Sequence, residues 1–300
     1  DRERLALFVF VYVILLFHIS GYIGNEMATT AFSVSMAIVE EGTLRIDAYT
    51  VGARELAYRD GHFYSGMRPG QSLIAASLYL LFRPVIAPAA EQIAPRLAHL
   101  EAARVYHLDQ PFAVRRLLLI VAFTVLLAMP GAAATAVMVV DLGEAVGERV
   151  GTLAELLLPL CTIWWTYGTE YGPRILGGFL LLLPLWWVFV RRDRASPRQR
   201  LFMSGAIGAG LAMAPLIRYE LIIPAVAVGL WALIRLMPRA KIALLMGALL
   251  VGGLGGAYHD HCYGSPTHTS YTYKIWPESG LLPRHAAIAH RLTRVEYEGG

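Results

Sequence analysis

Charged residues are scarce in this chain of 300 residues: Asp, Glu, Lys and Arg make up 16% of it, against about 25% in an ordinary soluble domain. Cysteine is nearly absent, and the two present, Cys161 and Cys262, are far apart in the sequence. This spacing argues against a disulfide framework and against the paired-cysteine pattern of a zinc site. The chain also lacks a Walker phosphate loop, a His-Glu-x-x-His motif and a nucleophile elbow, so nothing in it indicates nucleotide hydrolysis, zinc proteolysis or serine esterase chemistry.

Apolar sequence is what the chain has in abundance, because hydrophobic residues make up 56% of it. Apolar segments fall near residues 5–23, 70–90, 117–140, 151–167, 175–190, 201–217, 221–236 and 241–258. Each is close to the ~20 residues that a helix needs to cross about 30 Å of hydrocarbon. We therefore expect an all-α integral membrane protein, a polytopic bundle of about 7–8 transmembrane helices that forms a single domain over residues 1–300.

One glycine-rich stretch, Gly252-Gly253-Leu254-Gly255-Gly256, has a composition similar to that of a dinucleotide-binding loop. It lies inside an apolar segment, however, and no strand precedes it. We expect these glycines to allow close packing of helices instead.

Two short basic loops set the expected orientation in the membrane. Residues 191–200 hold five arginines and one aspartate, and residues 235–241 add three cations and no acid. Both loops should be cytoplasmic, so the basic residues of the chain indicate membrane orientation and not nucleic acid as a partner. An inside N-terminus then places 24–69 and 259–300 outside. These assignments conflict if every apolar segment crosses, and we expect 70–90 to be re-entrant or half-crossing.

Four polar and aromatic pieces collect on the outer side in this scheme: 24–69, 167–174, 217–220 and 258–268. We expect them to share a cavity. Within the first piece, residues 27–39 have apolar positions at helical spacing, which predicts an amphipathic helix lying in the membrane interface.

The stretch 58–70 reads Tyr-Arg-Asp-Gly-His-Phe-Tyr-Ser-Gly-Met-Arg-Pro-Gly, and an apolar run follows directly. A polar, aromatic loop at a membrane entry point suits a ligand with a charged head and a lipid tail. Asp60-Gly61 is also a common turn signal, because Gly supplies a positive φ angle. A structural turn and a ligand site both remain open here.

This loop resembles the "DGHYYS-x-K-x-PG" loop of bacterial membrane glycosyltransferases of the GT-C superfamily, which includes protein O-mannosyltransferases and the aminoarabinose transferases of lipid A. Residues 156–190 are similar to the family's "TPxxxYSTxxFGH" stretch. Residues 259–271 resemble its "YNxxxFGSPxxTGY" stretch, through Tyr263-Gly264-Ser265-Pro266 and Tyr271. The order and spacing of the three stretches agree with those of the family.

The resemblance implies a GT-C-like arrangement with a large first outer loop, in the bacterial cytoplasmic (inner) membrane. It implies an enzyme that passes a sugar from a polyprenyl-phosphate donor to an acceptor on the outer face. Glu26 matches the acidic residue that serves as base, and Asp60 is the second catalytic candidate. The implied substrate-binding and phosphate-binding residues are His62, Tyr64, Arg68, Arg218, Tyr263 and Tyr271.

A second interpretation starts from two departures from the family pattern. Met67 stands where the family has a lysine, and Asn25 where it has an aspartate, although Arg68 can supply a cation next to Met67. The alternative is therefore a chain of this ancestry that has lost its chemistry and serves as a structural subunit of a larger membrane complex. The expected partners are membrane lipids, a polyprenyl-phosphate sugar and other membrane-protein subunits.

His259, Asp260 and His261 have the residue types of a metal site. Histidines at i and i+2 do not share one helix face, and no third ligand is specified. We therefore predict no metal site and no cofactor, with a divalent cation as the open alternative.

Overall fold

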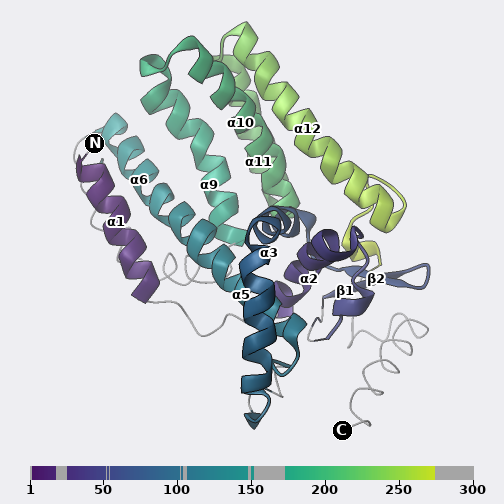
Figure 1. Cartoon of the computed structure of the whole chain (residues 1–300). Helices are drawn as coiled ribbons and strands as arrows, with labels where there is room; N and C mark the ends of the chain where they lie inside the picture. The colour runs from purple at the N-terminus through teal and green to yellow at the C-terminus, as the bar shows by residue number, and fades with distance from the viewer. Residues whose placement is uncertain are drawn as a thin grey trace. The chain divides into compact units, whose positions relative to one another are not determined.

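The computed structural model describes residues 2–17, 26–51, 53, 55–101, 103, 107–147, 150–151 and 173–273. The described chain is mostly helical, with one two-stranded hairpin (Figure 1). Five of its helical runs are long and apolar enough to cross a membrane: Pro69–Leu97, Pro111–Val146, Ile175–Arg194, Pro197–Ile217 and Pro238–Tyr263. The prediction of a helical, multi-pass membrane protein is confirmed at this level.

The expected count of 7–8 crossings is not reached among these described runs. Segment 5–23 corresponds to α1 (Arg2–Phe17), which has 16 residues as described, and segment 221–236 to α11 (Ile222–Arg235), which has 14. Segment 151–167 lies outside the described residues, apart from its first residue.

The chain forms two compact units. The first, which we call the bundle unit, comprises Asp1–Gly24 and Leu117–Gly255. The second, the hairpin unit, comprises Asn25–Arg116 and Gly256–Gly300. Each unit is described by itself below.

Six long helices and two π-helical turns supply the described bundle unit, together with α1. They are α5 (Pro111–Phe123), a π turn (Thr124–Ala128), α6 (Met129–Val146), α9 (Pro173–Trp186), a second π turn (Trp187–Arg191), α10 (Pro197–Ile217), α11 and α12 (Pro238–Tyr263). Pro130 supplies no backbone donor next to the first π turn, and the helix continues through it. The first part of α5 and the last part of α12 belong to the hairpin unit.

Contacts within the bundle unit fix the direction of α1, α6 and α9. The Tyr12 hydroxyl donates to the Val125 carbonyl at 3.2 Å, and the Arg4 Nε lies 2.7 Å from Asp141 Oδ1, so α1 runs antiparallel to α6. The Trp186 indole donates to the same Asp141 carboxylate at 2.7 Å. A Cβ at Gly131 would lie 3.7 Å from the Leu176 side chain, so α9 runs parallel to α6.

The backbones of α10 and α12 come into close contact at two glycines, Gly208 and Gly247. A Cβ at Gly208 would lie 1.9 Å from the Leu244 carbonyl oxygen, and one at Gly247 would lie 2.0 Å from the Gly205 carbonyl oxygen. Only glycine fits at such a distance, and the close approach increases dispersion contact between helices. A third contact lies further along both helices, because a Cβ at Gly255 would lie 2.6 Å from the Leu216 side chain, so the two helices run parallel.

The glycine-rich stretch 252–256 differs in part from its expected role. A Cβ at Gly255 would lie 2.6 Å from the Leu216 side chain, which is close helix packing as predicted. Nothing lies within 4 Å of a Cβ at Gly252 or Gly253. The glycines of α12 that allow close packing are therefore Gly247 and Gly255. The hydropathy of the sequence does not distinguish them from the other glycines nearby.

Both basic loops lie at one end of the bundle unit. The Arg192 guanidinium donates to the Arg235 carbonyl at 3.1 Å, which joins the loop after α9 to the loop after α11. Ser196 and Gln199 form a reciprocal capping box that starts α10 at the same place. This shared end is what the positive-inside rule requires of two cytoplasmic loops.

The hairpin unit contains the only two strands of the described chain, β1 (Leu56–Arg59) and β2 (His62–Ser65), which pair antiparallel with Arg59 opposite His62. The connecting residues Asp60 and Gly61 have φ angles of 52° and 86°. Two positive φ angles are typical of the tight turn that matches the strand twist. The turn interpretation of Asp60-Gly61 is therefore confirmed, and it does not exclude a ligand role.

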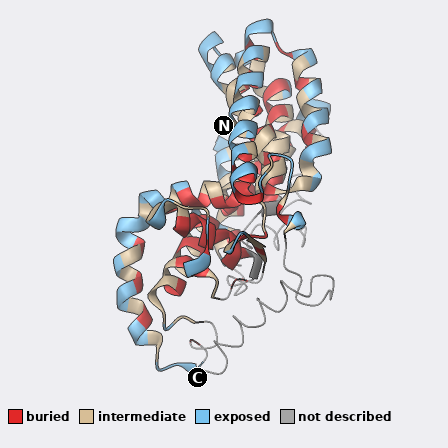
Figure 2. Cartoon of the chain, turned by 90° about the vertical axis from the view of Figure 1, so that its right-hand side faces the viewer, coloured by how far each residue is buried: buried red, intermediate tan, exposed pale blue. Residues whose placement is uncertain are grey.

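Helix α2 (Glu26–Glu41) packs against α3 (Pro69–Leu97), and a 3₁₀ turn (Asp47–Tyr49) follows it. Every residue from Ala28 to Ala37 is buried (Figure 2). The polar side chains of α2 are bonded inside the protein: the Ser35 hydroxyl donates to the Ser72 carbonyl at 2.8 Å. The helix expected over 27–39 is present, but it differs from an interfacial amphipathic helix because residues 28–37 are buried on every face.

We predict that Gly208→Ala destabilises the bundle unit, because its Cβ would overlap the backbone of α12. Overpacking of this kind costs about 1–3 kcal/mol, which should lower the melting temperature of the protein in detergent. Gly252→Ala is the matched control on α12, since its Cβ meets nothing within 4 Å. An equal response of the two variants would contradict the close contact.

Candidate functional site

The hairpin is bonded to the segment that follows α12. The Tyr263 hydroxyl donates to the Ser65 carbonyl at 2.7 Å, and the Tyr58 backbone N–H donates to the Tyr273 carbonyl at 3.1 Å. The first and last of the four outer pieces predicted from sequence therefore meet in one unit, although about 200 residues separate them. The piece 167–174 falls on residues whose side chains lie outside the described ones.

Arg59 fills the space between the hairpin and this C-terminal segment. Its Nε lies 3.0 Å from Asp60 Oδ2, and its Cζ lies 6.0 Å from the centroid of the Tyr273 ring. A Cβ at Gly264 would lie 2.9–3.0 Å from the guanidinium atoms, and Gly264 has a φ angle of 75°. The positive φ angle favours glycine at this position, and the guanidinium lies where a Cβ would be.

Arg68 precedes the first turn of α3 and reaches the C-terminal segment from there. Its Nη2 donates to the Tyr271 hydroxyl at 2.7 Å, and its Cζ lies 5.7 Å from the centroid of the same ring. The backbone of Arg68 is extended, its side chain does not cap the helix, and Pro69 takes the first helical position. The first-turn amides of a helix carry partial positive charge, so Arg68 adds a full charge at an end that already favours anions.

Asp47 holds the imidazole of His62 at the other end of β2. The His62 Nδ1 and the Asp47 Oδ2 are 2.8 Å apart, and the Phe63 N–H donates to Asp47 Oδ1 at 2.7 Å. With Nδ1–H donated to the carboxylate, Nε2 is the nitrogen that accepts a proton or a hydrogen bond. Both side chains are partly exposed.

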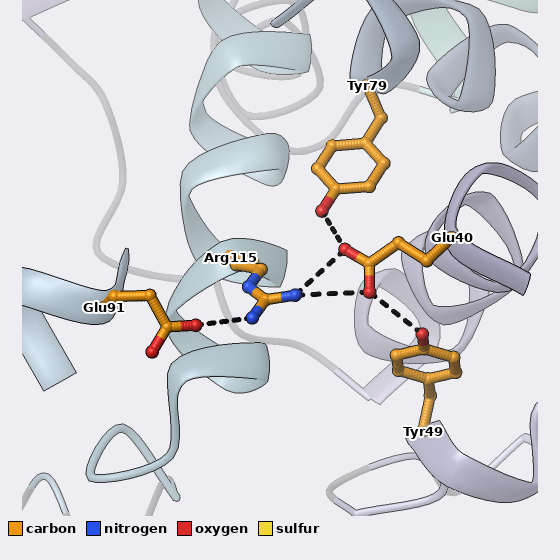
Figure 3. Close-up of polar contacts among 5 residues, drawn as sticks. All are labelled: Glu40, Tyr49, Tyr79, Glu91 and Arg115. Carbon is orange, nitrogen blue, oxygen red and sulfur yellow. Dashed lines mark hydrogen bonds and ion pairs between the residues drawn. The ribbon is translucent and has the colours of Figure 1, made fainter. Parts of the chain in front are cut away.

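A network centred on Glu40 joins four elements of the hairpin unit (Figure 3). The Glu40 carboxylate accepts from the Tyr79 hydroxyl, from the Tyr49 hydroxyl at 3.1 Å and from Arg115 Nη1 at 3.1 and 3.2 Å. Arg115 Nη2 also lies 2.5 Å from Glu91 Oε1. The network thus connects α2, the 3₁₀ turn, α3 and the start of α5.

Burial and bonding act in opposite directions on Glu40. Burial raises its pKa, but the Tyr79 hydrogen bond and the Arg115 charge outweigh that effect and hold the pKa below its usual value. Burial also raises the pKa of Tyr49, and the neighbouring Glu40 charge adds to the increase. Glu40 is therefore ionised and Tyr49 is a neutral donor at neutral pH.

The residues predicted from sequence distribute over both units. Arg218 belongs to the bundle unit, where its Nη2 lies 3.1 Å from Glu220 Oε1. Glu26 is the first residue of α2, and its side chain lies outside the described ones. The other six, Asp60, His62, Tyr64, Arg68, Tyr263 and Tyr271, belong to the hairpin unit. Their chemical roles stay predictions.

Sequence reasoning missed the residues that hold these side chains in place: Asp47, Arg59, Glu40, Tyr79 and Arg115. Their partners are distant in the chain, and the spacing of residues along the sequence does not predict such pairs. One signal was present, because a two-residue Asp60-Gly61 turn places Arg59 directly opposite His62.

Among the described residues, no group of three or more His, Cys, Asp or Glu side chains is placed to hold a metal ion. The absence of a cofactor stays a prediction. Comparison of the chain with known protein families, with curated proteins and with solved structures finds no match. The resemblance to GT-C glycosyltransferases therefore rests on the sequence stretches alone.

We predict that Glu40→Gln lowers the free energy of unfolding by about 2 kcal/mol, because the charged hydrogen bonds of Arg115 lose their acceptor charge. Denaturant titration in detergent measures the change. Glu101→Gln, at an exposed position after α3, is the control and should stay within about 0.5 kcal/mol of the wild type. Equal stabilities of the two variants would sink the idea that the network holds the unit together.

The stabilising effect of Glu40 should also depend on pH. Its pKa is lowered from the ordinary 4.5, so its contribution is complete above about pH 4.5 and is lost as the pH falls through the lowered value. The difference in unfolding free energy between the wild type and Glu40→Gln should therefore shrink in acid. Unfolding curves measured between about pH 7 and pH 3 test this, and a difference that stays constant over that range would contradict it.

Proposed function

We propose that this chain is a membrane glycosyltransferase that moves a sugar from a polyprenyl-phosphate donor to an acceptor hydroxyl on the outer face of the bacterial inner membrane. The observation that carries the proposal is the Arg68 guanidinium, held at 2.7 Å by the Tyr271 hydroxyl at the N-terminal end of α3. The GT-C resemblance supplies the reaction, and this geometry supports a site for its leaving group.

Transfer of the sugar leaves the donor phosphate with an additional negative charge. A preorganised cation and helix N-terminal amides stabilise such a charge without reorganising as it develops. Arg68 offers a planar fork that matches two phosphate oxygens, and the Tyr271 ring and hydroxyl limit its rotation. Tyr263 keeps the C-terminal segment against the hairpin through Ser65.

On this proposal Glu26 is the base that accepts the proton of the acceptor hydroxyl. Asp60 and His62 lie at the other end of β2 from Ser65, about 10 Å of extended strand away. On this proposal the tip of the hairpin serves the acceptor and Arg68 serves the donor. Tyr64 is buried between them on the same strand.

The second candidate, a structural subunit without chemistry, is favoured by one observation. Met67 occupies the position of the family's lysine, and the neighbouring cation Arg68 is already bonded to Tyr271. A site that holds the fold together in this way needs no substrate.

Native mass spectrometry of the gently solubilised chain tests the donor site. We expect co-purified polyprenyl phosphate to fall about 10–100-fold in Arg68→Ala, since a charge-assisted bond contributes about 1.5–3 kcal/mol. Arg68→Lys should retain part of the binding, and Arg96→Ala, at an exposed position on the same helix, should retain all of it. Lipid that persists unchanged in Arg68→Ala would remove the proposal's main support.

Glu26→Gln then separates the enzyme from the structural subunit. The enzyme requires that this variant keeps the bound lipid and loses transfer of a labelled sugar. A wild-type chain that binds stoichiometric membrane-protein partners, and neither the lipid nor the sugar, would support the structural subunit instead.

A further inference from the structure

Helix α3 has the length and composition of a transmembrane crossing. It has 29 residues, and its most apolar 18-residue window has a mean hydropathy of 1.7. By these two criteria it is one of the five candidate crossings in the described chain. The directions of α1 and α6 give a different result.

The chain between the start of α1 and the end of α6 returns to the side of the membrane from which it started. Arg4, near the start of α1, lies beside Asp141 and Glu144, near the end of α6. One crossing by α1 and one by the continuous run from Pro111 to Val146 already account for that return. The segment between Phe17 and Pro111 must therefore cross an even number of times.

Helix α3 is the only candidate crossing in the described part of that segment. Helix α2 has 16 residues and buries Thr and Ser side chains, and each strand has four residues. The stretches 18–25 and 98–110 are each shorter than the ~20 residues that a crossing needs. A single crossing by α3 would make the number odd, so α3 does not cross.

We propose that α3 lies along the outer surface of the membrane, with its exposed apolar residues in the lipid leaflet. Leu80, Leu81 and Val85 are 66%, 71% and 67% exposed, and Arg83 is exposed among them. The opposite side of the helix, which includes Ala75, is buried. Apolar side chains beside an arginine fit the boundary between acyl chains and phosphate headgroups.

The charged groups of the hairpin unit support the same placement. Glu91 of α3 pairs with Arg115, and Arg115 also pairs with Glu40, whose carboxylate accepts from Tyr79 of α3. Glu91 is 54% exposed. Arg83 is the exposed charge near the middle of α3. A charge at that position of a crossing helix costs about 2.5–3.5 kcal/mol, and this cost disappears at a membrane surface.

This placement also resolves the conflict in the orientation predicted from sequence. Without a crossing by α3, the basic loops stay cytoplasmic while 24–69 and the segment after α12 both stay outside. The inference does not depend on the proposed glycosyltransferase activity.

Cysteine labelling tests the location of the residues after α3. In a background with Cys161→Ser and Cys262→Ser, we expect Glu101→Cys to react with a membrane-impermeant maleimide in intact right-side-out spheroplasts. Asp60→Cys at the hairpin tip is the outside control, and Asp193→Cys, in a basic loop, is the inside control that reacts only after permeabilisation. Protection of Glu101→Cys to the same extent as Asp193→Cys would show that α3 crosses and would overturn the inference.

A nitroxide attached at Leu81→Cys identifies what covers the exposed side. In lipid, collisions with oxygen should exceed those with a water-soluble nickel chelate, and the ratio should reverse for a nitroxide at Glu101→Cys. Low accessibility to both reagents at Leu81→Cys would mean that a protein subunit covers this side, and a ratio equal to that at Glu101→Cys would mean water. Either result rejects the lipid contact.

Discussion

The carboxylate of Glu40 accepts hydrogen bonds from Tyr49, Tyr79 and Arg115, and these residues come from three different elements. None of those elements is close to another in sequence at the point of contact, so the carboxylate fixes their mutual position. The start of α3, which places Arg68, and the 3₁₀ turn, which places Asp47, both depend on this arrangement. The hairpin is attached through the same turn, since the Ile46 N–H donates to the Phe63 carbonyl at 2.9 Å.

The two units achieve cohesion in different ways. The hairpin unit is held by charges and hydroxyl groups, many of them buried, and each needs its partner because an unpaired buried polar group is costly. The bundle unit relies on small residues that bring backbones together, as at Gly208 and Gly247, with one polar cluster of Arg4, Asp141 and Trp186. This contrast is what a lipid environment favours, because apolar side chains gain little from leaving lipid for protein.

Sequence reasoning predicted the helical segments well, because long apolar runs have a direct physical meaning in a membrane. It also predicted the turn at Asp60-Gly61, whose residue types have the required backbone freedom. It did not predict that α2 is buried on all sides, since Ser33 and Ser35 look like an exposed polar face until their carbonyl partners are known. Hydropathy also could not distinguish α3 from a crossing helix. Composition shows that a helix can lie in lipid, and it does not show on which side of the membrane each end of the helix lies.

The hydrogen bond between Tyr263 and Ser65 has a consequence for the order in which the protein is synthesised and folds. The hairpin unit is built from a stretch that leaves the ribosome early and another that leaves it late, with Leu117–Gly255 synthesised between them. At about 5–20 residues per second, the 198 residues from Ser65 to Tyr263 take roughly 10–40 s to synthesise, and the hairpin lacks this partner until then. During that interval the early stretch lacks its contacts with Tyr263, Tyr271 and Tyr273, so the hairpin unit can be completed only after α12 has been synthesised.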